Sequence, residues 1–332
     1  MEQITILGAG GWGTALAILL SQSSHPVTLW ARRREHATEL IRTRVNERYL
    51  ANFEIPREVR ITSDPREALS GSRLIISAIP SRYVREILQQ VRDLVPSGTC
   101  CVSAAKGIDV ASLKRMSEVH REVLGPGIQI VVLSGPSFAV ESVRGDPTAV
   151  VAASQDSSAA ERIQRIFSSA RFRVYTNSDV VGTEIGGAVK NVIAIASGVV
   201  TGLGFGSNTT AGLITRGLAE VCRLAVAMGG RAETLGGLAG LGDLVLTCTG
   251  SLSRNRSAGI QLAQGRTLQE VEQSSPMVAE GIPTTMATVR LARKFQVEMP
   301  ITEQMYQVLY ARKSPQAAIG ALMERRLKEE FQ

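Results

Sequence analysis

The first fourteen residues constrain the fold of this chain more than any other stretch. Residues 3–7 predict a buried strand, residues 8–13 form a glycine-rich turn, and a helix is expected to follow at once. The turn has the spacing G-x-G-x-x-G. We expect Gly8 to permit a tight turn, Gly10 to let a pyrophosphate approach the backbone, and Gly13 to let the helix pack on the strand. The helix N-terminus would offer free N–H groups to that pyrophosphate. The stretch therefore predicts a dinucleotide-binding site.

The end of the second expected strand, residues 26–30, indicates which dinucleotide is bound. An NAD site usually carries an Asp or Glu about 20 residues past the glycines, where it binds the ribose 2′-hydroxyl. Here the strand is followed by Arg32, Arg33 and Arg34. Guanidinium groups can bind a 2′-phosphate, and no carboxylate is available to repel it. A solvated basic turn is the alternative interpretation. The position favours NADP(H), with NAD(H) as a second cofactor.

Apolar strands alternate with helices over the first half of the chain, which predicts a mainly parallel sheet covered on both faces. Further strands are expected at 59–62, 72–79, 99–104, 129–133, 148–152 and 172–175, and helices at 35–50, 83–94 and 112–123. From about residue 179 only helices are expected, at 180–200, 208–228, 254–264, 283–296, 301–312 and 315–330. The fold class is therefore α/β: a Rossmann-like domain over residues 1–182, then an all-helical domain over residues 183–332 that binds substrate and carries catalysis. Because ligands of such sheets bind at strand carboxyl ends, one crevice should collect Gly8, Ala31, Pro80, Lys106 and Gly135.

Composition narrows the class of ligand and the compartment. The formal net charge is +7, but the basic residues are scattered and no basic run is interleaved with aromatics, so a small phosphorylated substrate fits better than nucleic acid. The four cysteines have neither C-x-x-C nor zinc spacing, which predicts reduced thiols and no metal site. No signal peptide precedes the first strand, so we expect a cytoplasmic protein. The uncharged stretch 191–215 contains Asn, Thr and Gly, which favours a buried helix over a membrane span.

A dehydrogenase needs a proton donor beside the carbon that exchanges hydride. The three histidines do not follow expected strands, and no Tyr-x-x-x-Lys pair is present. Lys190 is the only charged residue between Glu184 and Arg216. Burial would lower its pKa towards about 7–8, where it could exchange a proton. A lysine that extends its ammonium from an interdomain helix to solvent is an equal alternative from the residues alone.

Four other positions are candidates for substrate contacts. Lys106, at a strand end beside a glycine, could bind an anion, or it could be an ordinary loop lysine. Residues 251–256 lie at the start of an expected helix, which Ser253 or Asn255 could cap. Arg254 and the free N–H groups of that helix could together bind a phosphate. From these residues alone, simple capping is the better interpretation. Asp243, in an apolar glycine-rich loop, could orient a lysine or simply make a turn. Glu280 carries a weaker signal.

Together these stretches resemble bacterial NAD(P)-dependent sn-glycerol-3-phosphate dehydrogenases from end to end. The matching segments are GAGGWGTALA at 8–17, AAKG at 104–107, SGPSFAVE at 134–141, GGAVKNVIAIASG at 186–198, NTTAGLITRGLAE at 208–220, LGDLVLTCT at 241–249, SRNR at 253–256, VAEG at 278–281 and EMPITEQMYQVLY at 298–310. The resemblance implies reversible reduction of dihydroxyacetone phosphate to sn-glycerol 3-phosphate, the precursor of phospholipids. It also implies a homodimer.

The resemblance also implies a role for individual residues. Lys190 would be the proton donor and acceptor. Substrate contacts would come from Lys106, Gly135, Ser137, Lys190, Asp243, Ser253, Arg254 and Asn255. Cofactor contacts would come from Gly8, Gly10, Gly11, Trp12, Gly13, Arg32, Arg33, Lys106, Ala139, Arg254, Val278 and Glu280. Gly11 departs from the family, which often has serine there, and the arginine run varies, so the guanidinium that meets the 2′-phosphate is left open.

Two other functions remain as alternatives from the sequence. One is a related two-domain NADP-dependent reductase of hydroxyacids or ketoacids, which the adjacent lysine and phosphate elements disfavour. The other is a dinucleotide-sensing protein without catalysis, which the presence of Lys190 and of the other motifs in the second half of the chain disfavours.

Overall fold

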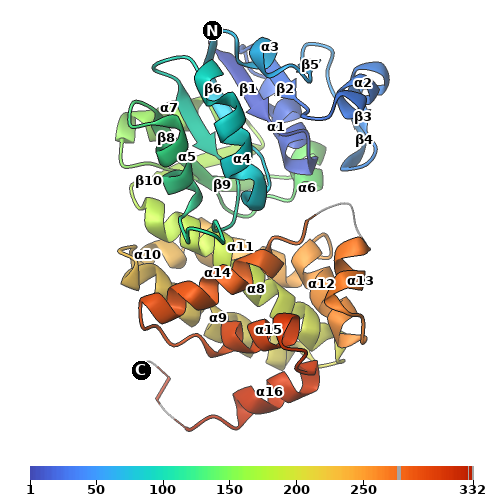
Figure 1. Ribbon diagram of the computed structural model, residues 1–332, viewed down its shortest axis with the longest axis vertical. Coiled ribbons are helices and arrows are strands. Elements are labelled where there is room, and N and C mark those ends of the chain that lie inside the picture. The colour runs from blue at the N-terminus through green and yellow to red at the C-terminus, as the bar shows by residue number, and fades with distance from the viewer. Residues whose placement is uncertain (275–277, 328, 331–332) are drawn as a thin grey trace.

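In the part of the chain that the computed structural model describes, residues 1–274, 278–327 and 329–330, eight strands form one sheet (Figure 1). In sheet order they are β10 (Phe172–Asn177), β9 (Thr148–Ala153), β8 (Gln129–Ser134), β7 (Cys100–Ser103), β6 (Ser72–Ser77), β1 (Gln3–Leu7), β2 (Val27–Trp30) and β5 (Arg60–Thr62). Neighbouring strands run parallel, except that β9 is antiparallel to β8. The expected mainly parallel sheet is confirmed.

Helices cover both faces of this sheet. Successive strand residues point to opposite sides, and apolar residues on both sides are buried against helices. On β6, Ile76 packs in a buried cluster with α1 (Gly11–Ser21), α2 (Arg34–Thr43) and α7 (Ser157–Phe167). The preceding residue of β6, Ile75, packs on the other face with α3 (Pro65–Leu69), α4 (Ser81–Val91) and α5 (Met116–Leu124). The short helix α6 (Ala139–Arg144) follows β8. The sheet is therefore sandwiched as the alternation predicts.

The helix expected over residues 35–50 is wrong in its second half. Helix α2 ends at Thr43, and Arg44 adopts a left-handed conformation with φ 55°. A hairpin of β3 (Val45–Asn46) and β4 (Leu50–Glu54) follows. The side chain of Asn46 explains the break, because its amide donates to the carbonyl oxygen of Ala9 at 3.0 Å and holds the hairpin against the glycine turn.

After β10 the described residues contain helices and no further strand, as expected (Figure 1). They are α8 (Val180–Gly202), α9 (Ser207–Ala227), α10 (Ala232–Leu235), a π-helical turn η2 (Leu238–Gly242), α11 (Asp243–Thr249), α12 (Arg254–Ala263), α13 (Leu268–Gln273), α14 (Gly281–Lys294), α15 (Pro300–Tyr310) and α16 (Pro315–Met323). Helix α8 lies at their centre and packs against α9, α11, α12 and α14. The boundary predicted between residues 182 and 183 falls in the first turn of α8 and stays a prediction.

Helix α8 is long and apolar enough to cross a membrane by length and composition, and 89% of its most apolar window is buried inside the protein. It is the core helix expected from its Asn, Thr and Gly content. Three other expectations need correction. The helix expected from residue 112 begins at Met116, the C-terminal helix ends at Met323 rather than near 330, and Asp243 begins a helix rather than lying in a loop. Helices of four to six residues (α3, α6, α10 and α13) are too short for apolar periodicity to reveal.

Candidate active site

A cavity of about 620 Å³ lies where the carboxyl ends of the parallel strands meet the helical part of the chain. Gly8, Ala31, Pro80 and Lys106 line it from the sheet side, as the strand-end argument predicts. The remaining predicted site residues that line it are Gly10, Gly11, Trp12, Arg32, Arg33, Ser137, Ala139, Lys190, Asp243, Ser253, Arg254, Asn255, Val278 and Glu280. Gly135, which the strand-end argument also placed in this crevice, and Gly13 are not among the residues that line the cavity. The fold thus brings segments from both halves of the chain to one cavity.

The glycine turn has the geometry that a pyrophosphate needs. Gly8 has φ +111°, and a Cβ there would lie 2.8 Å from the carbonyl oxygen of Ala78. A Cβ on Gly13 would lie 1.8 Å from the carbonyl oxygen of Gly8, so Gly13 allows α1 to pack on the turn. At Gly10, by contrast, a Cβ would meet nothing within 4 Å. Gly10 caps α1 without a side-chain hydrogen bond, so the N–H groups of the first turn face the open cavity. These residues fit a dinucleotide.

Two lysines share one buried carboxylate at the centre of the cavity. Lys190 Nζ lies 2.8 Å from Asp243 Oδ1, and Lys106 Nζ lies 2.7 Å from Asp243 Oδ2. Lys106 also donates to the carbonyl oxygen of Gly135 at 2.8 Å, and Lys190 donates to Thr247 Oγ1 at 2.6 Å. Asp243 is 1% exposed and Lys190 is 6% exposed, so the interactions act with little solvent screening. Asp243 therefore orients the lysines rather than making a turn.

Burial lowers the pKa of Lys190, Asp243 opposes this shift and the positive charge of Lys106 adds to it, and the resulting pKa is about 8. The ammonium contacts Thr247 and Asp243 and the side chain is buried, so it does not extend to solvent as the alternative interpretation required. A group with this pKa exchanges protons near neutral pH. Lys190 can therefore act as a general acid or base.

The start of α12 forms the opposite wall. Ser253 caps the helix by accepting a hydrogen bond from the N–H of Arg256 at 3.2 Å. Asn255 is buried, and its amide donates to Asn191 Oδ1 at 2.9 Å while its oxygen accepts from the N–H of Gly281. Arg254 is exposed, donates to the carbonyl oxygen of Val278 at 3.1 Å and feels the charge of Glu280, and no other described residue accepts a hydrogen bond from it. The arrangement leaves its guanidinium available to an anion beside the helix N-terminus.

Glu280 joins the two halves of the chain. One of its carboxylate oxygens accepts from the N–H of Ser81 at 3.1 Å, and the other bonds to the Ser81 hydroxyl. Desolvation raises the pKa of Glu280, which the two hydrogen bonds oppose. Gly107 is required beside them, because a Cβ there would lie 2.4 Å from Ser81 Oγ.

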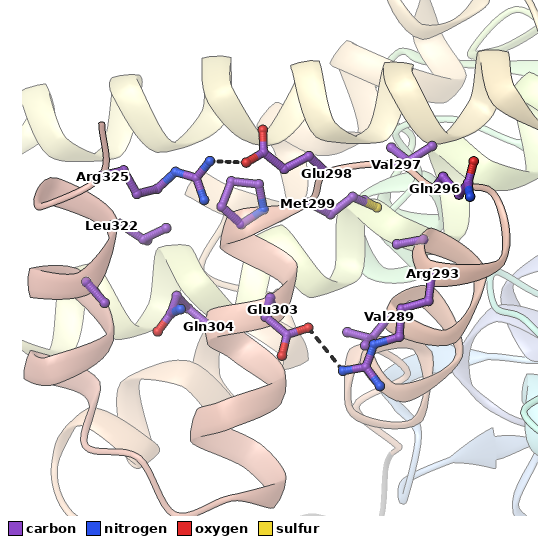
Figure 2. A pocket seen from close by; sticks show the side chains of 13 residues that line it. Val289, Arg293, Gln296, Val297, Glu298, Met299, Glu303, Gln304, Leu322 and Arg325 are labelled. Atoms are coloured by element: carbon purple, nitrogen blue, oxygen red, sulfur yellow. Dashed lines mark hydrogen bonds and ion pairs between the residues drawn. The ribbon is translucent and has the colours of Figure 1, made fainter. Parts of the chain in front are cut away.

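Several polar residues that line the cavity were not predicted from the sequence, among them Thr247, Asn191, His36, Arg48 and Tyr49. Thr247 follows Asp243 by one helical turn, a signal that became usable only once α11 was known to be a helix. His36 was set aside because it follows no strand directly, yet α2 places it on the cavity wall. A second cavity, of about 460 Å³, lies between α14, α15 and α16 and contains no predicted site residue (Figure 2).

Comparison with known proteins assigns both halves of the chain to one family. The family models for the NAD-dependent glycerol-3-phosphate dehydrogenase N-terminus and C-terminus match residues 3–160 and 179–320. A glycerol-3-phosphate dehydrogenase [NAD(P)+] from Citrifermentans bemidjiense is 51% identical over 331 residues, covering 99% of each chain. One from Oleidesulfovibrio alaskensis is 51% identical over 329 residues, covering 99% of this chain and 100% of that protein.

Solved structures agree with this assignment. The crystal structure of a glycerol-3-phosphate dehydrogenase from Coxiella burnetii is 40% identical, has a TM-score of 0.94, and covers 98% of this chain and 99% of its own. A ketopantoate reductase from Ralstonia eutropha has a TM-score of 0.62 at 16% identity, which indicates a shared fold alone. The chain belongs to the NAD(P)-dependent glycerol-3-phosphate dehydrogenase family.

Proposed function

We propose that this protein interconverts dihydroxyacetone phosphate and sn-glycerol 3-phosphate with NADP(H), or less efficiently NAD(H), and so supplies glycerol 3-phosphate for phospholipid synthesis. The observation that carries the proposal is the buried ammonium of Lys190, 2.8 Å from Asp243 at the ends of the nucleotide-binding strands. We infer that the cavity residues named above act as the family resemblance implies, with Gly13 supporting the glycine turn and Gly135 accepting a hydrogen bond from Lys106. We also propose a homodimer located in the cytoplasm, on the family resemblance alone.

Lys190 acts on the oxygen of the reacting carbon. A reduced dinucleotide held at the glycine turn of Gly8 and Gly10 would supply the hydride for the ketone carbon, and Lys190 Nζ would give its proton to the oxygen on which negative charge develops. Asp243 keeps the ammonium charged and directed, and Thr247 fixes its orientation through the 2.6 Å hydrogen bond. Lys106 adds a second positive charge close to the same position. In the reverse direction, neutral Lys190 accepts the alcohol proton.

The phosphate of the substrate is held by Arg254 and the N-terminus of α12. This distant contact positions the ketone relative to Lys190 and contributes to catalysis through orientation.

Replacing Arg254 by alanine should lower kcat/KM for dihydroxyacetone phosphate by about 10- to 100-fold, the effect of one lost charge-assisted contact. The same substitution at Arg266, an exposed arginine bonded to Gln261, serves as the control. Steady-state kinetics measures both. Unchanged kcat/KM in the Arg254→Ala variant would refute the phosphate role.

The pH dependence should differ between the two directions. Ketone reduction needs protonated Lys190, so kcat/KM for reduction should fall as the pH rises through about 8, whereas alcohol oxidation needs the neutral amine and should rise over the same range. Initial rates in both directions between pH 6 and about 10 would measure this. Parallel profiles in the two directions would contradict the assignment of Lys190.

A further inference from the structure

Tyr49, in the hairpin after α2, contacts three nitrogen-bearing side chains, those of Arg33, Arg48 and His36. Arg33 Nη2 donates to the Tyr49 hydroxyl at 3.3 Å. The guanidinium carbon of Arg48 lies 5.3 Å from the centre of the Tyr49 ring, and the ring of His36 meets the same ring edge-on at 5.6 Å. All four side chains line the cavity. Within the described residues, no carboxylate pairs with Arg33 or Arg48, so their charges are available to a ligand.

The other two members of the arginine run are placed differently. Arg32 Nη1 lies 3.3 Å from Glu86 Oε1, and its guanidinium faces the ring of Tyr83, so a carboxylate already compensates its charge. Arg34 is the first residue of α2 and lies outside the cavity lining. The run therefore presents one uncompensated guanidinium, that of Arg33, to the cavity.

The hairpin that carries Arg48 and Tyr49 is fixed to the pyrophosphate turn. Asn46, 1% exposed, donates to the carbonyl oxygen of Ala9 at 3.0 Å and to Thr14 Oγ1 at 2.7 Å. A Cβ on Gly11 would lie 2.7 Å from the carbonyl oxygen of Tyr49, so the glycine permits this close approach. The positions of Arg48 and Tyr49 are thus set by the same turn that binds the pyrophosphate.

We propose that Arg48, together with Arg33 and Tyr49, forms the site for the 2′-phosphate of NADP(H), and that Arg48 determines the preference for the phosphorylated dinucleotide. This inference rests on the proposed function. Two guanidinium groups on either side of one phosphate can each donate to its oxygens, while the Tyr49 hydroxyl positions Arg33. NAD(H) has only a hydroxyl at this position and would leave both charges uncompensated. Arg48 comes from a separate hairpin, which explains why the arginine run alone does not identify the site.

The test is calorimetric binding of adenosine 2′,5′-bisphosphate and of 5′-AMP, which differ only in the 2′-phosphate. Arg48→Gln and Arg33→Gln should each weaken the bisphosphate by about tenfold and change 5′-AMP by less than about twofold. Arg48→Lys should restore part of the affinity because it keeps the charge. Arg34→Gln, with the same change in net charge, should leave both ligands unaffected.

Two results would overturn the inference: a loss in Arg48→Gln no larger than that in Arg34→Gln, or an equal loss for both ligands. Kinetics separates this from the proposed function. Arg48→Gln should lower kcat/KM for NADPH about tenfold more than it lowers kcat/KM for NADH in the reduction of dihydroxyacetone phosphate. If the wild type reduces no ketone with either dinucleotide, and Arg48→Gln still selectively loses the bisphosphate, the proposed reaction is wrong and the 2′-phosphate site is supported.

Discussion

Replacing Lys190 by methionine should lower kcat by about 10²- to 10⁴-fold, the usual contribution of a general acid or base, while NADPH still binds. The side chain is 6% exposed, and the pKa of its ammonium is about 8. Methionine retains the volume of the aliphatic chain, so packing around α8 should change little. Lys190→Arg should also be nearly inactive, because a guanidinium does not release its proton.

The matched control is Lys294→Met, which removes an exposed lysine at the end of α14. Stopped-flow or steady-state rates give kcat, and NADPH fluorescence gives the affinity for cofactor. Near-normal turnover in Lys190→Met would remove this residue from the mechanism.

Replacing Asp243 by asparagine should have the second large effect, a loss in kcat/KM of about 100-fold or more. The substitution leaves Lys190 and Lys106 facing each other without the carboxylate that both contact. Because Asp243 raises the pKa of Lys190, the variant lysine should titrate below about 8, and ketone reduction should decline at lower pH than in the wild type.

The pH shift distinguishes this role from simple destabilisation, because a smaller folded fraction lowers the rate without moving the profile. Asp93→Asn, at a side chain 85% exposed and paired with Arg92, is the control. A profile for Asp243→Asn that stays in place, or moves to higher pH, would contradict the proposed coupling.

The sequence predicted the features that depend on local pattern. The strand, glycine turn and helix at the N-terminus are specified by residues adjacent in the chain, and the uncharged stretch around Lys190 made its burial one of two equal interpretations. The last helix, expected from residue 315, begins at Pro315, where the Ser314 side chain accepts a hydrogen bond from the N–H of Ala317. These signals need no knowledge of distant contacts.

The features that sequence reasoning missed depend on contacts across the fold. The hairpin after α2 exists because Asn46 bonds to Ala9, 37 residues earlier in the chain. The two lysines are brought together by Asp243, which is 137 residues from Lys106. Neither contact leaves a periodic or compositional trace, so Arg48 and Thr247 could be assigned only from the structure.

The measurement that tests the account most directly is NADPH oxidation with dihydroxyacetone phosphate and, separately, with unphosphorylated dihydroxyacetone. The account predicts rapid turnover of the phosphorylated ketone and little or none of the other, because Arg254 and α12 position the ketone through its phosphate. Equal turnover of both ketones, or no turnover of either by a protein that binds NADPH, would contradict it.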